Sequence, residues 1–138
     1  MTDKEYREQK RRLKKLADRW LKPLGLLWWK VQIVYDCDGL QQPEDKSRSL
    51  IGVTTVDWHY LLATITFDMR EIARQSDDDL EMQFVHECCH ILINEMRMWA
   101  GEEMSRDKLE EVMKHEERTA TMLAKAFIWT RQAGQGDE

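Results

Sequence analysis

The stretch FVHECCHILI, residues 84–93, places two histidines four positions apart, with a glutamate directly after the first. In an α-helix, residues four apart lie on the same face, one turn from each other. If this stretch is helical, His86 and His90 point the same way, and their ring nitrogens can reach one ion at the roughly 2.0–2.1 Å that zinc requires. Glu87 leans toward the same edge of the helix, where it can accept a proton from metal-bound water.

The setting of this motif favours a metal site over a chance match, although short patterns of this kind do occur by chance. The alternative is two histidines on a partly exposed helix face that bind no metal. Cys88 and Cys89 lie about 100° and 200° round the helix from His86, so one helix cannot aim all of them at the same ion. We therefore expect both cysteines to be buried thiols, rather than metal ligands or a redox sensor.

The residues before the motif predict the elements that surround it. Ser76 offers an N-cap, and three aspartates fill the next turn, where the helix dipole favours negative charge. This helix is predicted to run to about Trp99 and to stop at Gly101. Alternating residues in YLLATITFD, residues 60–68, predict a strand, and similar patterns predict strands over residues 28–35 and 50–56.

Helices are expected at both ends of the chain. Apolar residues at helical spacing predict one helix over residues 3–21 and another over residues 105–132. Residues 36–49 combine turn formers and charges without a period, which predicts a mobile loop, and residues 133–138 are expected to fray. The order of helix, three strands and two helices predicts an α+β fold in a single domain of residues 1–138.

Charge is distributed unevenly along the chain. Residues 1–22 carry nine Lys/Arg against four Asp/Glu, a net of +5, whereas the other 116 residues carry 12 against 22, a net of −10. A basic N-terminal helix on an acidic body suggests contact with nucleic acid or an acidic protein. A helix with a solvated face is the simpler interpretation, so nucleic acid is the less favoured partner.

Composition also bears on where the protein works. The chain has no run of 18 apolar residues, so we expect no membrane span. No apolar segment follows the basic N-terminus, which argues against a secretory signal. Three cysteines form no visible disulfide framework, which favours a reducing compartment and hence the cytoplasm.

A catalytic zinc usually has three protein ligands and a water, so the third ligand must come from another segment. The predicted last helix offers His115, Glu116 and Glu117. That helix must approach the motif closely, which requires small residues three and seven positions after the ligand. Counted from Glu117, these positions hold Ala120 and Ala124. Counted from Glu116 or His115, they hold larger residues. Glu117 is therefore favoured, with Glu116 second because it lies nearer the centre of the apolar stripe; a solvent-facing acidic cluster is the alternative.

The motif at residues 86–90, followed by Glu117 and two spaced alanines, resembles the gluzincin group of zinc metallopeptidases. In that group the third ligand is a glutamate on a later helix, followed by small residues. The stretch VDWHYLLATITFDM, residues 56–69, is similar to what small, stand-alone gluzincin-like domains of phage and prophage carry. The resemblance covers about residues 28–130.

This resemblance implies a minimal zincin core that hydrolyses peptide bonds. It implies that His86, His90 and Glu117 bind Zn²⁺ and that Glu87 is the general base. It also implies that the strand at residues 60–68 lines the cleft and pairs with an extended protein or peptide substrate.

Larger gluzincins stabilise the oxyanion with a Tyr or His from a second domain, which this chain does not carry. The obvious substitutes are His59, Tyr60 and His115, and a partner protein that completes the site is another solution. The competing hypothesis is a non-catalytic zincin-fold protein that binds nucleic acid or an acidic partner through the helix in residues 1–22.

Overall fold

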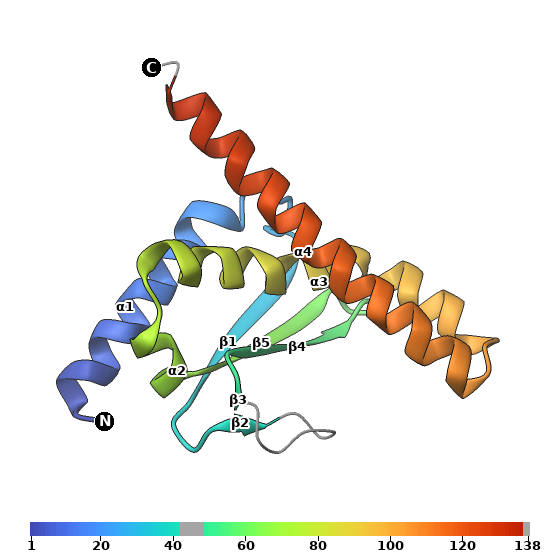
Figure 1. Ribbon diagram of the computed structural model, residues 1–138, viewed down its shortest axis with the longest axis horizontal. Helices are drawn as coiled ribbons and strands as arrows, with labels where there is room; N and C mark the ends of the chain where they lie inside the picture. The colour runs from blue at the N-terminus through green and yellow to red at the C-terminus, as the bar shows by residue number, and fades with distance from the viewer. Residues whose placement is uncertain (42–48, 137–138) are drawn as a thin grey trace.

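A mixed three-stranded sheet forms the centre of the protein in the computed structural model, which describes residues 1–41 and 49–136 (Figure 1). The strand order is β1-β5-β4. β1 (Lys30–Asp36) pairs parallel with β5 (Leu62–Asp68), which on its other side pairs antiparallel with β4 (Gly52–Asp57). Two short strands, β2 (Leu40–Gln41) and β3 (Ser49–Leu50), pair separately.

Helices cover the sheet and confirm the predicted α+β class. They are α1 (Asp3–Trp20), α2 (Met69–Arg74), α3 (Asp77–Glu102) and α4 (Arg106–Gly136). α3 packs on the sheet, and α4 returns across α3, so that its C-terminal end projects away from the sheet (Figure 1). This crossing brings the middle of α4 against the part of α3 that carries the two histidines.

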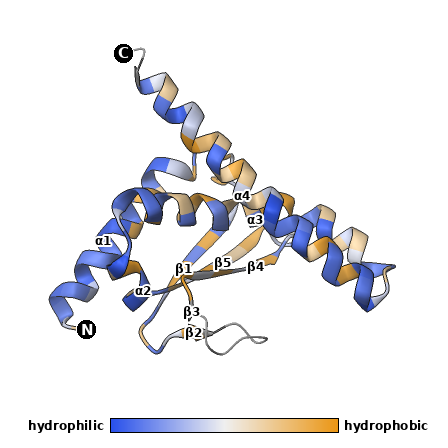
Figure 2. Ribbon diagram, viewed as in Figure 1, coloured by the Kyte–Doolittle hydropathy of each residue, from blue (hydrophilic) through white to orange (hydrophobic). Residues whose placement is uncertain are grey.

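The hydrophobic core lies between the sheet and the helices, and the outer helix faces are hydrophilic (Figure 2). Alternate residues of β5 are buried there, as the alternating pattern predicts: Ala63, Ile65 and Phe67. The rings of Phe67 and Phe84 stack with centroids 5.9 Å apart, which fixes α3 on the sheet. Burying side chains of this size contributes about 1.5–3 kcal/mol each to stability. Among the described helices, none combines the length and the apolar character that crossing a membrane demands.

The prediction that the strand at residues 60–68 lines the cleft and pairs with an extended peptide is wrong. β5 is the central strand, with its backbone paired to β1 on one side and to β4 on the other. It therefore has no free edge for a peptide. The strand also begins later than predicted, at Leu62, because Tyr60 and Leu61 lie in a turn in which Leu61 has a φ of 52°.

Three other segments differ from the sequence predictions. Asp68 ends β5 and accepts hydrogen bonds from the next backbone amides, so it caps α2, a short helix that the sequence pattern does not reveal. The predicted loop over residues 36–49 contains the end of β1 and both short strands, and residues 42–48 lie outside the described residues. α4 continues through most of the tail predicted to fray and includes its two glycines, Gly134 and Gly136, although a glycine within a helix costs about 1 kcal/mol; residues 137–138 are not described.

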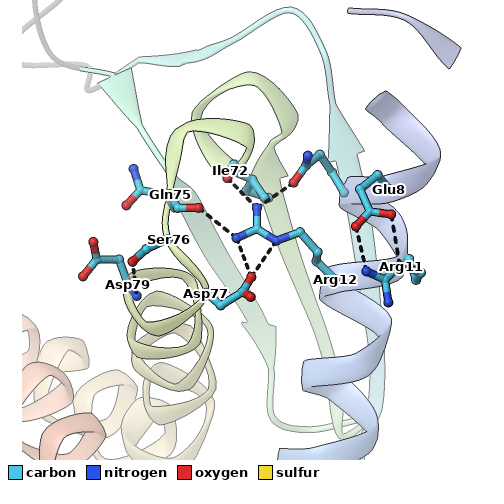
Figure 3. Close-up of polar contacts among 9 residues, drawn as sticks. Glu8, Arg11, Arg12, Ile72, Gln75, Ser76, Asp77 and Asp79 are labelled. Carbon is cyan, nitrogen blue, oxygen red and sulfur yellow. Dashed lines mark hydrogen bonds and ion pairs between the residues drawn. The ribbon is translucent and has the colours of Figure 1, made fainter. Parts of the chain in front are cut away.

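Arg12 joins the basic helix α1 to the turn between α2 and α3 (Figure 3). Its guanidinium donates hydrogen bonds to the carbonyl oxygens of Ile72 (3.0 Å) and Gln75 (2.8 Å). It also donates to Gln9 Oε1 at 2.8 Å and pairs with Asp77 Oδ1 at 2.9 Å. This side chain therefore satisfies backbone acceptors just where α3 begins.

We predict that Arg12→Met lowers the free energy of unfolding by about 2–4 kcal/mol, because two partly buried carbonyl oxygens lose a charged donor. Arg11→Met is the matched control: among the described residues, Arg11 forms its ion pair with Glu8 on the helix surface, at 2.7 Å, and exposed pairs contribute about 0–1 kcal/mol. The midpoints of urea unfolding measure both effects. Equal shifts in the two variants would contradict the structural role of Arg12.

Candidate metal centre

α3 carries the histidine motif in its middle, as the sequence predicts. Ser76 caps the helix by accepting a hydrogen bond from the Asp79 amide at 3.1 Å, and the three aspartates occupy the first turn. The sheet-facing side of α3 buries Phe84, Val85, Cys88 and Cys89. His86 and His90 consequently lie on the side that faces α4, where each is only partly buried.

The side chains of His86, His90 and Glu117 converge on one point. The Nε2 atoms of the two histidines are 3.1 Å apart. Glu117 places Oε2 3.2 Å from His86 Nε2, and its Oε1 2.9 Å from His90 Nε2. The close approach of α4 is possible because Ala120 and Ala124 are fully buried beneath it. The structure thus brings together the three residues that the sequence predicts as ligands.

The two Nε2 atoms and the two carboxylate oxygens of Glu117 are spaced as ligand atoms around one metal ion such as zinc would be. Around a tetrahedral ion with bonds of about 2.0–2.1 Å, ligand atoms lie about 3.3 Å from one another. The observed separations of 2.9–3.2 Å are close to that value. Glu117 is 64% exposed, so the group remains open to solvent on one side, as a catalytic rather than a closed structural site requires.

Each histidine ring is also held at its other nitrogen. His90 Nδ1 lies 2.9 Å from Glu116 Oε1, and His86 Nδ1 lies 3.2 Å from Thr121 Oγ1. Because a carboxylate only accepts, the His90 Nδ1 must donate to Glu116. In the neutral ring, Nε2 of His90 then keeps its lone pair for a metal, the arrangement that orients histidine ligands in metal sites.

The alternatives for the third ligand take other positions. Glu116 is 11% exposed and is held between His90 and Arg97, whose Nε lies 2.9 Å from Glu116 Oε2. It therefore supports the ring of His90 from behind and leaves Glu117 to complete the group. His115 is 63% exposed and lies beside Glu111 on the outer surface of α4.

Glu87 is the most buried acidic side chain of the site, only 4% exposed. Thr54 Oγ1 on β4 donates a hydrogen bond to one of its carboxylate oxygens at 2.5 Å. Gln83 Nε2, one turn earlier on α3, donates to the other at 2.9 Å. Gly52 lies against it as well: a Cβ at Gly52 would be 3.4 Å from Glu87 Cγ and 3.2 Å from the Phe67 ring. The carboxylate is thus fixed beside the histidines by two donors and by close packing.

A cleft runs along β4 past the three converging residues. It consists of two adjoining hollows of about 370 and 660 Å³, and Leu50, Gly52, Glu87 and Glu117 line both of them. In the described part of the chain, β4 pairs with β5 alone, so its other edge is unpaired. The strand that lines the cleft is therefore β4, and not the segment 60–68.

The ionisable side chains of the site are expected to link metal binding to the release of protons. Burial lowers the pKa of His90, but hydrogen bonds to Glu116 and Glu117 outweigh it and raise that pKa to about 10. Hydrogen bonds from His86 and His90 hold the pKa of Glu117 well below its usual range. Without a metal, His90 is therefore protonated at neutral pH, and a metal ion bound there would have to displace that proton.

We predict that zinc binding at pH 7–9 releases about one proton from His90, so that affinity rises about tenfold per pH unit. The direction follows from the raised pKa: the proton is held below about pH 10 and competes with the metal throughout this range. Competition with a chromophoric chelator, corrected for the titration of the chelator itself, measures the slope. An affinity independent of pH would contradict this prediction.

The two cysteines of the motif are buried thiols, which confirms the expectation for them. Cys88 and Cys89 are fully buried against the sheet. Burial raises the pKa of Cys88 strongly and that of Cys89 to about 11. Neither thiol has the exposure or the thiolate character that a redox sensor needs.

We predict that iodoacetamide labels one cysteine of the native protein and three of the unfolded protein. Cys37 is exposed and reacts, whereas Cys88 and Cys89 are protected by burial. Mass spectrometry of the native and the urea-unfolded protein counts the labels. Rapid native labelling of either motif cysteine would contradict this packing.

The residues expected to stabilise an oxyanion lie elsewhere. His59 stacks on Trp58 at 3.9 Å in the turn after β4. Tyr60 is 76% exposed in the same turn, and His115 lies on the outer surface of α4. None of the three lines either hollow of the cleft.

Much of the positive charge of α1 is used within the fold. Arg12 binds the turn before α3, and Arg19 pairs with Glu81 at 3.0 Å. Lys10 lies over the ring of Tyr35, 4.9 Å from its centroid. These contacts leave fewer free cations for nucleic acid or an acidic partner, and binding through this helix remains a prediction.

Comparisons with known proteins add no further information on this site. No protein-family model matches the chain. No curated protein and no solved structure matches it either.

Proposed function

We propose that the protein is a zinc-dependent metallopeptidase. The observation that supports this most strongly is the convergence of His86, His90 and Glu117, within 4.8 Å of one another, beside the buried carboxylate of Glu87. A general base placed next to an open three-ligand group is the combination that metal-assisted hydrolysis needs.

Each residue of the site has a distinct task in this proposal. The three residues would hold a zinc ion, which would lower the pKa of a bound water toward 7 and supply a nucleophile at neutral pH. Glu87, held in position by Thr54, would accept the proton of that water. Glu116 keeps the His90 ring turned toward the ion through its bond to Nδ1.

The cleft favours an extended peptide as the substrate. The unpaired edge of β4 can hydrogen-bond to the backbone of an added strand, a common mode of peptide recognition. Gly52 projects no side chain where β4 passes Glu87; a Cβ there would meet the Phe67 ring at 3.2 Å and Glu87 Cγ at 3.4 Å, so the strand packs closely against the base. The hollow on the His86 side is bounded by Leu50, Ile51 and Met82, which favours an apolar substrate side chain there.

Cleavage of unstructured peptides tests the proposal. Purified protein loaded with one equivalent of zinc is incubated with a mixture of fluorogenic peptides that vary in sequence, and cleavage products are identified by mass spectrometry. We expect cleavage that disappears when a chelator removes the zinc and returns when zinc is restored. Cleavage that persists in the zinc-free protein, or zinc that does not bind, would refute the proposal.

A further inference from the structure

A peptidase of the proposed kind must stabilise the negative charge that develops on the carbonyl oxygen under attack, and this inference rests on the proposed function. The residues predicted for this task lie outside the cleft. The donor must therefore come from other residues that line the cleft. The side-chain donors beside His86 and Glu87 are Gln83 and Thr121, and those of the second hollow, apart from Thr54 and His90, are Arg97 and Lys114.

Three of these donors are unsuitable. Thr121 Oγ1 lies 3.2 Å from His86 Nδ1 and holds that ring. Arg97 is paired with Glu116. Lys114 is exposed, and its flexible side chain has no described contact that would fix it in the cleft. A preorganised donor has to be held in place before the substrate arrives, which leaves Gln83.

Gln83 is held in the orientation that the task requires. It lies three residues before His86 and four before Glu87, on the face of α3 that forms the cleft. Its Nε2 donates to Glu87 Oε1 at 2.9 Å, so the amide nitrogen, rather than the oxygen, is turned toward the base. A carboxamide nitrogen has two N–H groups, and Glu87 accepts from one of them.

We propose that the second N–H of Gln83 binds the carbonyl oxygen of the peptide bond that is cleaved. In this step, water oxygen forms a bond to the carbonyl carbon while its proton passes to Glu87. The π electrons of the C=O bond move onto the carbonyl oxygen, where the Gln83 N–H stabilises the charge. When the C–N bond breaks, the electrons return to restore C=O, and Glu87 delivers its proton to the leaving amine.

Two substitutions of Gln83 test this role. Gln83→Met keeps the length of the side chain, and Gln83→Leu keeps much of its volume; neither offers an N–H or adds a charge beside Glu87. We expect each to lower kcat by about 10²–10³-fold, the usual cost of losing an oxyanion donor, with zinc affinity and KM little changed. The matched control is Thr54→Val, which removes the other hydrogen bond to Glu87 but no donor to the oxyanion.

A phosphinic peptide, in which a tetrahedral phosphinate replaces the cleaved amide, separates the two roles of Gln83. We expect both Gln83 variants to bind it more weakly by the factor lost in kcat, and Thr54→Val to bind it like the wild type. Reduced kcat with unchanged phosphinate affinity would overturn the inference, because Gln83 would then only position Glu87. Unchanged kcat, or loss of zinc in both Gln83 variants, would overturn it as well. An inactive wild-type protein refutes the peptidase proposal itself, which distinguishes that failure from failure of Gln83 alone.

Discussion

Replacing Glu87 with glutamine is expected to lower peptide cleavage by about 10²–10⁴-fold, the contribution typical of a general base. Glutamine keeps the size of the side chain and can still contact Thr54 and Gln83, so the cleft keeps its shape. It cannot take a proton from water at neutral pH. Since Glu87 is not among the three converging ligand residues, zinc affinity is expected to stay at the wild-type value.

The matched control is Glu95→Gln, which makes the same change of charge on an exposed face of the same helix. We expect it to leave both cleavage and zinc affinity unchanged. Turnover numbers on one fluorogenic peptide and zinc affinities by chelator competition give both comparisons. Retained cleavage in the Glu87 variant would show that a different group accepts the proton, and loss of zinc would show that Glu87 has a structural role at the metal.

Local sequence patterns predicted the three long helices and the histidine face correctly, although not the short α2, because these patterns depend on contacts three and four residues apart. Ser76 caps α3, and His86 and His90 point the same way. The two alanines after Glu117 are buried, as their spacing suggested, because only small residues permit that helix spacing; which glutamate binds a metal stays a prediction. In each case the deciding neighbours lie on one helix face and can be found by counting residues.

The sheet could not be predicted in the same way, because strand order depends on pairings between distant segments. The alternation in residues 62–68 shows which side of β5 is buried, but a central strand and an edge strand can share that pattern. β1 pairs in parallel with one side of β5. This makes β5 the central strand and leaves β4 at an edge of the sheet. The cleft consequently lies beside β4, and no residue pattern within residues 52–57 marks that strand as the one at the sheet edge.

The supporting residues of the site were missed for a related reason. Thr54 reaches Glu87 across 33 residues of sequence, and Arg97 meets Glu116 only because α3 and α4 pack against each other. Gln83 is the exception. It lies one turn before Glu87, and this i to i+4 spacing is visible in the sequence as a hydrogen-bonding pair.

The two neighbouring glutamates of α4 are expected to differ in what they do for zinc. Glu117 contributes carboxylate oxygens within 3.2 Å of both Nε2 atoms, whereas Glu116 contacts His90 only at Nδ1. If about 10–16 kcal/mol of zinc affinity is shared among four ligands, each contributes roughly 3–4 kcal/mol. Glu117→Ala is then expected to weaken zinc binding by about 10²–10³-fold, and Glu116→Ala by about 10–100-fold, the range for residues that orient a ligand.

His115→Ala is the matched control, since it removes a third polar side chain from the same turn of α4 but lies on the outer surface. We expect zinc affinity in this variant to equal that of the wild type. Titration of the zinc-free proteins against a chelator of known affinity ranks all three on one scale. If Glu116→Ala weakens zinc binding more than Glu117→Ala does, Glu116 is the ligand. If both variants lose the same small amount of zinc affinity, neither carboxylate binds the ion, and the proposed site is not a metal site.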